Sequence, residues 1–234
     1  MTHKIWHFSD THTHHKDLKV PNEEGLISIF SGDCSNPKDF LQNTLEVLSF
    51  LDWYAIQNID SKIFVAGNHD VSIEKNRITK QDFKDRGIIY LENDSVEIND
   101  LKIWGSPLTP SFGSGWAWNK ARHKLDKYWA HIPDDTDILV THGPPKGFLD
   151  YTCNNNKRIE QCGCESLKNR VLSLNLSAHC FGHIHNRDSI HNAGMFLGKN
   201  FDGKSIIFSN GTVTEDRTQK GLTGNGNYFK INKE

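Results

Sequence analysis

Short apolar runs alternate with longer amphipathic segments along the chain, a pattern typical of an α/β protein. Five of the runs have the length and composition of buried strands, and they cover residues 4–8, 26–30, 62–66, 138–141 and 178–181. Between the second and third runs, apolar residues recur at helical spacing from Phe40 to Leu51, with Asn36 as a cap and Pro37 in the first turn. This order of strand, helix and strand predicts a βαβ unit.

The rest of the chain continues the alternation of strands and helices. Residues 95–98 and 101–105, joined by the turn pair Asn99-Asp100, predict a hairpin. Helices are expected over residues 117–130 and 167–176, and further strands over 205–209 and 228–231. No repeat, low-complexity tract or linker divides the chain, and 234 residues suit one domain with elaborations. We therefore expect a single domain over residues 1–234.

Composition narrows the class of protein. The 27 Lys and Arg residues balance 29 Asp and Glu residues, the net charge is −2, and no basic run is present. A stable nucleic-acid partner held by bulk electrostatics is therefore not expected. No apolar stretch approaches the ~18 residues of a transmembrane helix, and the N-terminus becomes polar too early for a signal peptide. Five cysteines are an odd number in a chain too large to need disulfides, so we expect a cytoplasmic protein without membrane contact.

Each of the five predicted buried strands is followed by residues that bind metals. The segments are Ser9-Asp10-Thr11-His12, Gly32-Asp33-Cys34-Ser35, Gly67-Asn68-His69-Asp70, His142-Gly143 and Gly182-His183-Ile184-His185. In open α/β sheets, sites lie beyond the carboxyl ends of the strands, so these residues should converge there. Imidazole and carboxylate ligands suit zinc, iron and manganese without any thiolate. The sequence therefore predicts a metal centre at this edge of the sheet.

These five segments resemble, in order, the DxH, GDxx, GNH(D/E), H and GHxH pattern of the calcineurin-like metallophosphoesterases. The resemblance implies a four-layer αββα sandwich around two divalent or mixed-valence ions of manganese, iron or zinc, with manganese expected to support activity in vitro. By matching position, one ion is expected on Asp10, His12 and His185, and the other on Asn68, His142 and His183, with Asp33 as the bridge. His69 is then the uncoordinated histidine beside the substrate phosphate, and Asp70 is expected to orient it.

A further resemblance narrows the branch of the family. Gly105-Ser106-Pro107, the Trp-containing segment after it, residues 141–145 and Gly163-Cys164 are similar to the metallophosphoesterase domain-containing proteins, which are similar to class III cyclic-nucleotide phosphodiesterases. Some members of that branch have lost the first histidine of GHxH, whereas His183 is present here. The arginine that marks the phosphoprotein phosphatases after GDxxD is absent. These features favour phosphodiester over phosphoprotein substrates.

The expected activity is hydrolysis of small phosphodiesters, such as cyclic nucleotides, by attack of a metal-bridging hydroxide. A phosphodiester leaves as an alkoxide, so His69 is the candidate proton donor, an effect of ~10²–10⁴-fold. Two alternatives stay open: a nuclease that acts on short or single-stranded nucleic acid, and a non-catalytic scaffold that holds the metals. The sequence leaves the oligomeric state open.

Aromatic residues near the predicted site divide into pocket and core candidates. Trp116 and Phe112 lie in a Gly-rich loop and are candidates to stack a nucleobase, with Asn68 and His69 also expected to contact the substrate. Trp118 and Trp129 are expected to pack in the core.

The remaining histidines and cysteines are expected to have structural or surface roles rather than roles in the site. Solvated loop positions are predicted for His14, His15, His123, His131 and His191. Cys153, Cys162 and Cys164 are interpreted as structural or surface thiols, because Cys-x-Cys lacks the usual spacing of a zinc site.

Overall fold

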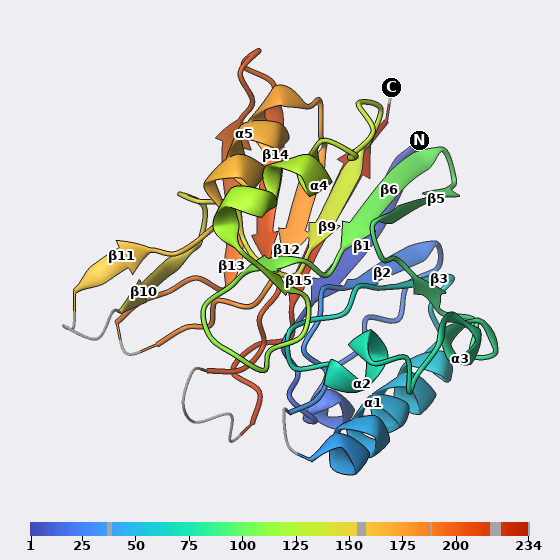
Figure 1. The fold of residues 1–234 in the computed structure, drawn as a ribbon. Helices are drawn as coiled ribbons and strands as arrows, with labels where there is room; N and C mark the ends of the chain where they lie inside the picture. The colour runs from blue at the N-terminus through green and yellow to red at the C-terminus, as the bar shows by residue number, and fades with distance from the viewer. Residues whose placement is uncertain (37–38, 154–157, 188, 216–220, 234) are drawn as a thin grey trace.

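The computed structural model describes residues 1–36, 39–153, 158–187, 189–215 and 221–233, and its strands form two large sheets that face each other (Figure 1). The first sheet has the order β15-β1-β2-β3-β4. Its strands are β15 (Asn227–Asn232), β1 (Thr2–Phe8), β2 (Leu26–Phe30), β3 (Ser61–Phe64) and β4 (Ile89–Tyr90). The second sheet has the order β13-β14-β12-β9-β6-β5. Its strands are β13 (Gly194–Lys199), β14 (Ser205–Asn210), β12 (Ala178–Phe181), β9 (Ile138–Thr141), β6 (Leu101–Ser106) and β5 (Asp94–Ile98).

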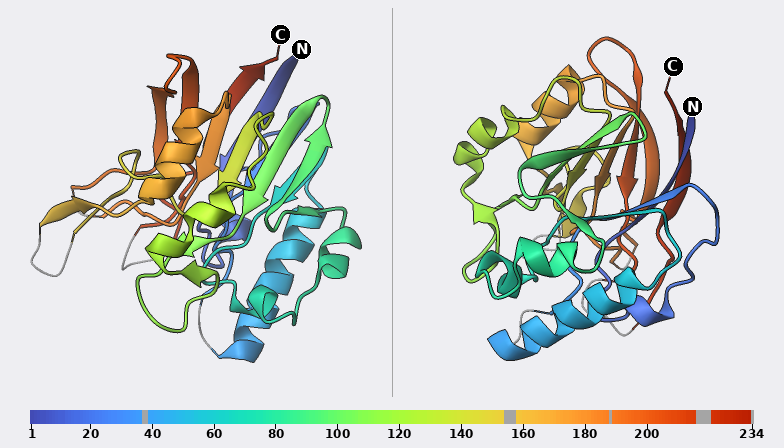
Figure 2. Two further views of the ribbon diagram at one scale, coloured as in Figure 1. Left: turned by 45° about the horizontal axis from the view of Figure 1, so that its top comes forward. Right: turned by 90° about the vertical axis from the view of Figure 1, so that its right-hand side faces the viewer.

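Helices cover the outer face of each sheet, and Figure 2 shows the two groups on opposite sides of the strands. The first sheet is covered by α1 (Phe40–Ala55), α2 (Val71–Glu74) and α3 (Lys80–Lys84), and the second by α4 (Asp126–Trp129) and α5 (Glu165–Ser173). Short 3₁₀ turns are η1 (His15–Asp17) and η2 (Arg122–Lys124). Two small ribbons pair β7 (Thr109–Pro110) with β8 (Asn119–Lys120) and β10 (Tyr151–Cys153) with β11 (Ile159–Gln161). The four-layer αββα sandwich is confirmed.

Period-two alternation along the strands builds the interior, because successive side chains of a strand point to opposite faces. Ile27 and Ile29 of β2 meet Ile138 and Val140 of β9 in an aliphatic core between the sheets. The intervening residues point outward, and Phe30 packs against α1 instead. Since both faces of the central strands are covered, the strands are mostly apolar, as parallel strands usually are, and His7, Ser28 and His179 are buried polar exceptions.

Aromatic side chains fill the layer between α1 and the first sheet. Phe50 is fully buried, and its ring centroid lies 4.4 Å from that of Phe30 and 5.7 Å from that of Phe64. The helix begins at Phe40, and Asp39 is its cap, accepting a hydrogen bond from the Gln42 amide at 2.9 Å. The prediction that Asn36 caps this helix is therefore wrong, and the predicted first-turn Pro37 lies outside the described residues.

Two helix predictions need correction. Residues 117–130 do not form one helix: Trp118 has φ 58°, residues Asn119–Lys120 form β8, and only Asp126–Trp129 is α-helical. Tertiary contacts override the local pattern, because the Ala117 amide donates to the Asn68 carbonyl and the Trp118 amide donates to Glu74. The helix expected over residues 167–176 spans Glu165–Ser173 and ends where Leu174 becomes extended.

The remaining element predictions hold to within a few residues. The five buried strands, the hairpin of β5 and β6, and the late strands β14 and β15 are all present. Strand β13 was not predicted, because its apolar residues are exposed and show no alternation. No helix among the described residues is both long enough and apolar enough to cross a membrane.

We predict that Phe50→Ala lowers the free energy of unfolding by about 3–5 kcal/mol, because it leaves a cavity in the aromatic layer. Chemical denaturation followed by circular dichroism measures this loss. Leu45→Ala, on the same helix but 54% exposed, is the matched control and should cost under about 1 kcal/mol. Equal losses for the two variants would contradict the packing described for α1.

Candidate metal centre

The carboxyl ends of five strands meet at one edge of the sandwich and bring all seven predicted ligands together. β1 is followed by Asp10 and His12, β2 by Asp33, β3 by Asn68, β9 by His142, and β12 by His183 and His185. Two groups of possible metal donors result, Asp10 with His12 and His185, and Asp33 with His142 and His183. Within each group the donor atoms lie within 4.8 Å of one another.

The backbone at these ligands is strained. Positive φ values occur at Asp10 (56°), His12 (41°), Asp33 (60°) and His183 (69°), a region that non-glycine residues rarely adopt. Hydrogen bonds between loops hold this geometry, since the Asp10 amide donates to the Gly32 carbonyl at 2.8 Å. Strain of this kind persists only where the surroundings enforce it, and it is typical of functional sites.

Close packing behind the ligands explains two of the glycines. A Cβ atom at Gly67 would lie 2.2 Å from Oδ1 of Asp33, and one at Gly182 would lie 2.0 Å from the Ser9 hydroxyl. Neither position can carry a side chain without moving Asp33 or Ser9. The glycines therefore let the ligand-bearing loops approach one another.

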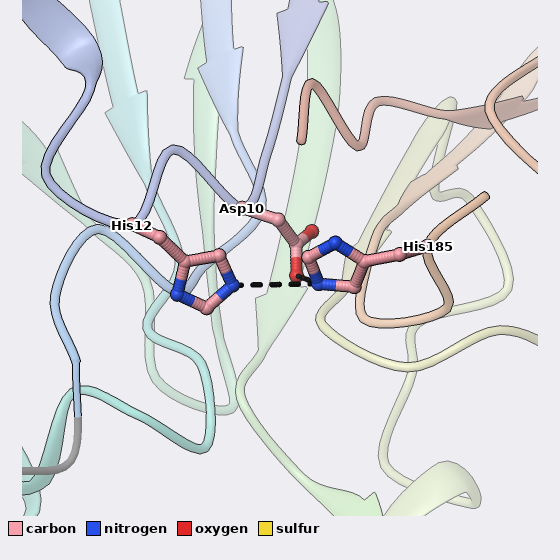
Figure 3. Close-up of side chains that lie close together, drawn as sticks. All are labelled: Asp10, His12 and His185. Atoms are coloured by element: carbon pink, nitrogen blue, oxygen red, sulfur yellow. Dashed lines mark hydrogen bonds and ion pairs between the residues drawn. The ribbon is translucent and has the colours of Figure 1, made fainter. Parts of the chain in front are cut away.

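Figure 3 shows the first group, in which Asp10, His12 and His185 point toward one another. Nε2 of His185 lies 3.2 Å from Oδ1 of Asp10 and 3.4 Å from Nε2 of His12. The other nitrogen of each ring faces a carbonyl oxygen. Nδ1 of His12 lies 3.3 Å from the carbonyl oxygen of Ser35, and Nδ1 of His185 lies 3.0 Å from that of Thr214. Carbonyl oxygens only accept, so each Nδ1 carries a hydrogen and each Nε2 lone pair faces the centre.

The second group repeats this arrangement around His142. Its Nδ1 donates to the Ser31 carbonyl at 2.8 Å, while its Nε2 lies 2.9 Å from Oδ1 of Asn68 and 3.2 Å from Oδ2 of Asp33. Three potential acceptors thus converge on one point. The ring centroid of His183 lies 4.9 Å from that of His142 and completes the group.

The pKa values of the histidines indicate that each donor group attracts a cation. Burial lowers the pKa of His12 to about 4 and that of His183 to about 3, so both rings are neutral at pH 7. Burial acts in the same direction on His142, but the facing Asp33 carboxylate outweighs it and raises the pKa of His142 to about 9. Asp10 likewise raises the pKa of His185 against the effect of burial. Each group therefore attracts one cation, which is the place that a metal ion takes in competition with a proton.

Asp33 belongs to both sides of the centre. Its carboxylate forms a donor group with His142 and His183, and another with His12 and His69. Oδ1 of Asp33 also accepts from the His69 amide at 2.7 Å, which fixes the carboxylate between the two sets. This position fits the bridging role expected for Asp33. The residues present therefore fit two metal ions, although the bridge itself stays a prediction.

His69 lies at the open side of the centre beside the aromatic residues of the loop that follows β7. Its ring centroid is 4.6 Å from that of His12 and 4.8 Å from that of Trp116. Phe112 lies next to these rings, with its ring centroid 5.5 Å from that of Trp116 and 5.0 Å from that of His183. Burial lowers the pKa of His69 to about 2. His69 also stands close enough to His12 and Asp33 to act as a ligand, so its uncoordinated role stays a prediction.

Asp70 has a different task from the one expected. Its Oδ2 accepts from the amides of Gly67 and Asp33 at 2.8 and 3.0 Å, and its Oδ1 accepts from the Cys34 amide and from the amide and hydroxyl of Ser35. Both oxygens are therefore committed to the loop that carries Asp33. The prediction that Asp70 orients the His69 ring is wrong, and Asp70 instead positions Asp33.

Sequence reasoning missed the segment after β14. Thr212 donates its hydroxyl to Oδ2 of Asp10 at 3.2 Å, and Thr214 supplies the carbonyl that orients His185. The signal was available, because these threonines follow a predicted strand whose end meets the same edge. One histidine was also misplaced: His15 is buried, with its ring 5.4 Å from those of Phe50 and Trp53.

The cysteine and tryptophan predictions agree with the structure. All five cysteines are free, and none belongs to a metal-type donor group among the residues described. Cys164 is buried and Cys162 is partly buried. Trp118 and Trp129 are buried in the core, as expected.

Comparison with known proteins agrees with this geometry. The sequence profile of the calcineurin-like phosphoesterase family matches residues 3–187. Metallophosphoesterase domain-containing protein 1 of Homo sapiens is 33% identical over 201 residues, which cover 76% of this chain and 59% of that protein. The UPF0046 protein K07C11.7 of Caenorhabditis elegans is 29% identical over 208 residues, which cover 82% of this chain and 66% of that protein. The chain thus spans about 59–66% of the length of these relatives.

A solved structure supports the fold independently. It shares 14% sequence identity and aligns with a TM-score of 0.61 over 99% of this chain and 95% of that chain. At this identity the likeness concerns the fold alone.

We predict that Asp70→Asn destabilises the protein by about 2–4 kcal/mol, because an amide nitrogen would face backbone donors that now share a carboxylate. Manganese affinity should fall about 10- to 100-fold, since Asp33 loses its support. Denaturation and calorimetric titration of manganese measure the two effects. Asp202→Asn, in an exposed turn, is the control and should change neither. Unchanged metal affinity in Asp70→Asn would refute the positioning role.

Proposed function

Because the chain belongs to the calcineurin-like phosphoesterase family, we propose that it is a metal-dependent phosphodiesterase that hydrolyses small phosphodiesters such as cyclic nucleotides. The observation that carries this proposal is the pair of donor groups, Asp10 with His12 and His185 and Asp33 with His142 and His183, which lie side by side because Asp33 is also within reach of His12. Seven ligands from five strand ends, all of hard or borderline type, suit manganese, iron or zinc. The name of the human relative, metallophosphoesterase domain-containing protein 1, supports the coarser part of the proposal, metal-dependent phosphoester hydrolysis.

The residues around the centre have different roles in the proposed hydrolysis. Two divalent ions held by these groups would supply a nucleophile at neutral pH and would neutralise charge at phosphorus. Three of the ligand imidazoles, those of His12, His142 and His185, are held by hydrogen bonds to backbone carbonyls, and Asp33 accepts from the His69 amide. The hydrophobic rings of Trp116 and Phe112 limit the access of water at the open side. The substrate phosphate is then held between the centre and His69.

His69 is assigned to the leaving-group side of the substrate. Nδ1 of His69 is buried and has no hydrogen-bond partner among the described residues, so the ring keeps a polar atom for a ligand. Burial favours a neutral ring, whereas an anionic phosphodiester beside it favours the protonated form. In the protonated ring an N–H donates to the leaving oxygen as the bond to phosphorus breaks.

The proposal favours diesters over monoesters. A phosphate monoester carries a second negative charge that needs an additional cation, usually an arginine. The loop after Asp33 offers Cys34 and Ser35, whose amides are already bonded to Asp70. No cationic side chain comes from this loop within residues 31–36.

We predict higher kcat/KM for bis-p-nitrophenyl phosphate and for cyclic nucleotides than for p-nitrophenyl phosphate, in protein loaded with manganese. Hydrolysis rates across this panel, with 2′,3′- and 3′,5′-cyclic nucleotides and a short single-stranded oligonucleotide included, test the proposal. A monoester that exceeds every diester would reverse the assignment. Preference for the oligonucleotide would make the protein a nuclease, and absence of any turnover would leave a metal-bound scaffold.

We also predict that His69→Ala lowers kcat for a cyclic nucleotide more than for bis-p-nitrophenyl phosphate. A ribose alkoxide is strongly basic and needs a proton, whereas p-nitrophenolate leaves as a stable anion. The difference could approach the ~10²–10⁴-fold of general-acid catalysis. Bound manganese is measured in the same preparations, and His123→Ala, on the surface turn η2, is the control.

Other outcomes assign His69 differently. Equal losses for the two substrates would show that His69 only steadies the phosphate electrostatically. Loss of manganese from His69→Ala would place the residue among the ligands instead.

A further inference from the structure

Two cavities adjoin the metal centre, and both reach the ligand His183. The first has a volume of about 210 Å³ and the second about 260 Å³. They share one wall, formed by Phe112, Thr152, His183 and Ile184. A group bound at the metals beside His183 therefore has room to extend in two directions, as the two ester arms of a phosphodiester require.

The first cavity is apolar. Pro110 and Pro144 form part of its lining, and Gly143 and Gly163 line it without side chains. Gly163 must stay small, because a Cβ atom there would lie 2.7 Å from the backbone of Pro145. A gap lined by prolines, glycines and one aromatic ring offers a flat slot rather than a polar site.

Arg122 is the one cationic side chain among the described residues of this lining, and its terminal nitrogens already bond to the backbone. Nη1 of Arg122 donates to the Gly163 carbonyl at 2.9 Å and Nη2 donates to the Cys162 carbonyl at 2.7 Å. These bonds hold the Cys162-Gly163 turn opposite Phe112 and use the two terminal nitrogens on the protein itself. Arg122 therefore shapes the cavity, and the planar face of its guanidinium suits contact with a ring.

The second cavity has a different character. His185, Tyr151 and Arg187 line it in addition to the shared wall. Its polar and charged lining suits a sugar or another hydrophilic group, so the two arms of the substrate need not be alike. The apolar cavity is the more selective of the two, because it excludes groups that must keep their hydration.

Building on the proposed phosphodiesterase function, we propose that one ester arm of the substrate carries an aromatic ring that enters the cavity lined by Phe112 and the Cys162-Gly163 turn. A cavity of ~150 Å³ lined by apolar residues holds a benzene ring. A volume of about 210 Å³ thus accepts a single ring or a small fused pair. The substrate class is that of phosphodiesters that carry an aromatic ring, and diesters without a ring bind less well.

The test uses two probes that are not hydrolysed, phenylphosphonate and methylphosphonate, titrated calorimetrically into manganese-loaded protein. Both present the same phosphonate to the centre, and only the first offers a ring. We expect phenylphosphonate to bind about 10- to 50-fold more tightly, as burial of one ring predicts. Equal affinities would overturn the proposal.

Filling the cavity should remove this preference. Cys162→Phe adds a ring to the lining while the backbone of Cys162 keeps its bond to Asp150. We expect the two phosphonates then to bind within about twofold of each other. Cys153→Phe, on β10 and outside both linings, is the matched control and should keep the full preference. A preference that survives in Cys162→Phe would contradict the assignment.

A second variant guards against misfolding of the first. Phe112 is half exposed, so Phe112→Ala leaves the core intact and removes one wall of the slot. We expect a loss of about fivefold or more in phenylphosphonate affinity with little change for methylphosphonate. Unchanged phenylphosphonate affinity would count against the proposal.

The failure of this inference is distinguishable from failure of the proposed function. Binding of methylphosphonate without any advantage for phenylphosphonate rejects the aromatic arm alone. If neither probe binds, the aromatic arm is rejected as well, and hydrolysis of bis-p-nitrophenyl phosphate then decides whether the chain is a phosphodiesterase.

Discussion

The convergence of buried donor atoms that need a cation between them is the constraint on which the rest of this structure depends. His12 and His185 face each other with their Nε2 atoms 3.4 Å apart, and His142 faces the oxygens of Asn68 and Asp33. Hydrogen bonds from the Nδ1 atoms to backbone carbonyls prevent the rings from turning away. Only a cation resolves this arrangement, and the raised pKa values of His142 and His185 show the demand at both groups.

The rest of the fold holds these donor atoms in place. The aliphatic core between the sheets and the aromatic layer under α1 fix the strand ends from both sides. Asp70 ties the Asp33 loop to the loop after β3, and left-handed residues such as Asp10 and His183 aim their side chains inward. Stability elsewhere thus offsets strain at the centre, as is usual for a preorganised site.

Sequence reasoning reached the strands and the ligands for a clear physical reason. Buried parallel strands are apolar on both faces, and the ligands follow them directly, so both signals are local. The helix prediction for residues 117–130 failed because the Trp118 amide bonds to Glu74 and the Ala117 amide bonds to the Asn68 carbonyl, and no local sequence pattern reports such contacts. The prediction for Asp70 failed for the same reason, since five of its six donors come from the distant loop of residues 33–35 and one comes from its own turn. Strand β13 is an exposed edge strand, and its sequence lacks the alternation of apolar and polar residues from which a strand is predicted.

The measurement that tests the central claim most directly is the metal content of the protein at saturating manganese, determined by elemental analysis. Two donor groups, with Asp33 of the second also within reach of His12 of the first, predict two ions per chain and a large loss of bound manganese in Asp33→Ala. Asp126→Ala, an exposed carboxylate on α4, should keep both ions. At most one ion in the wild type, together with unchanged content in Asp33→Ala, would contradict a bridged pair of metals at this centre.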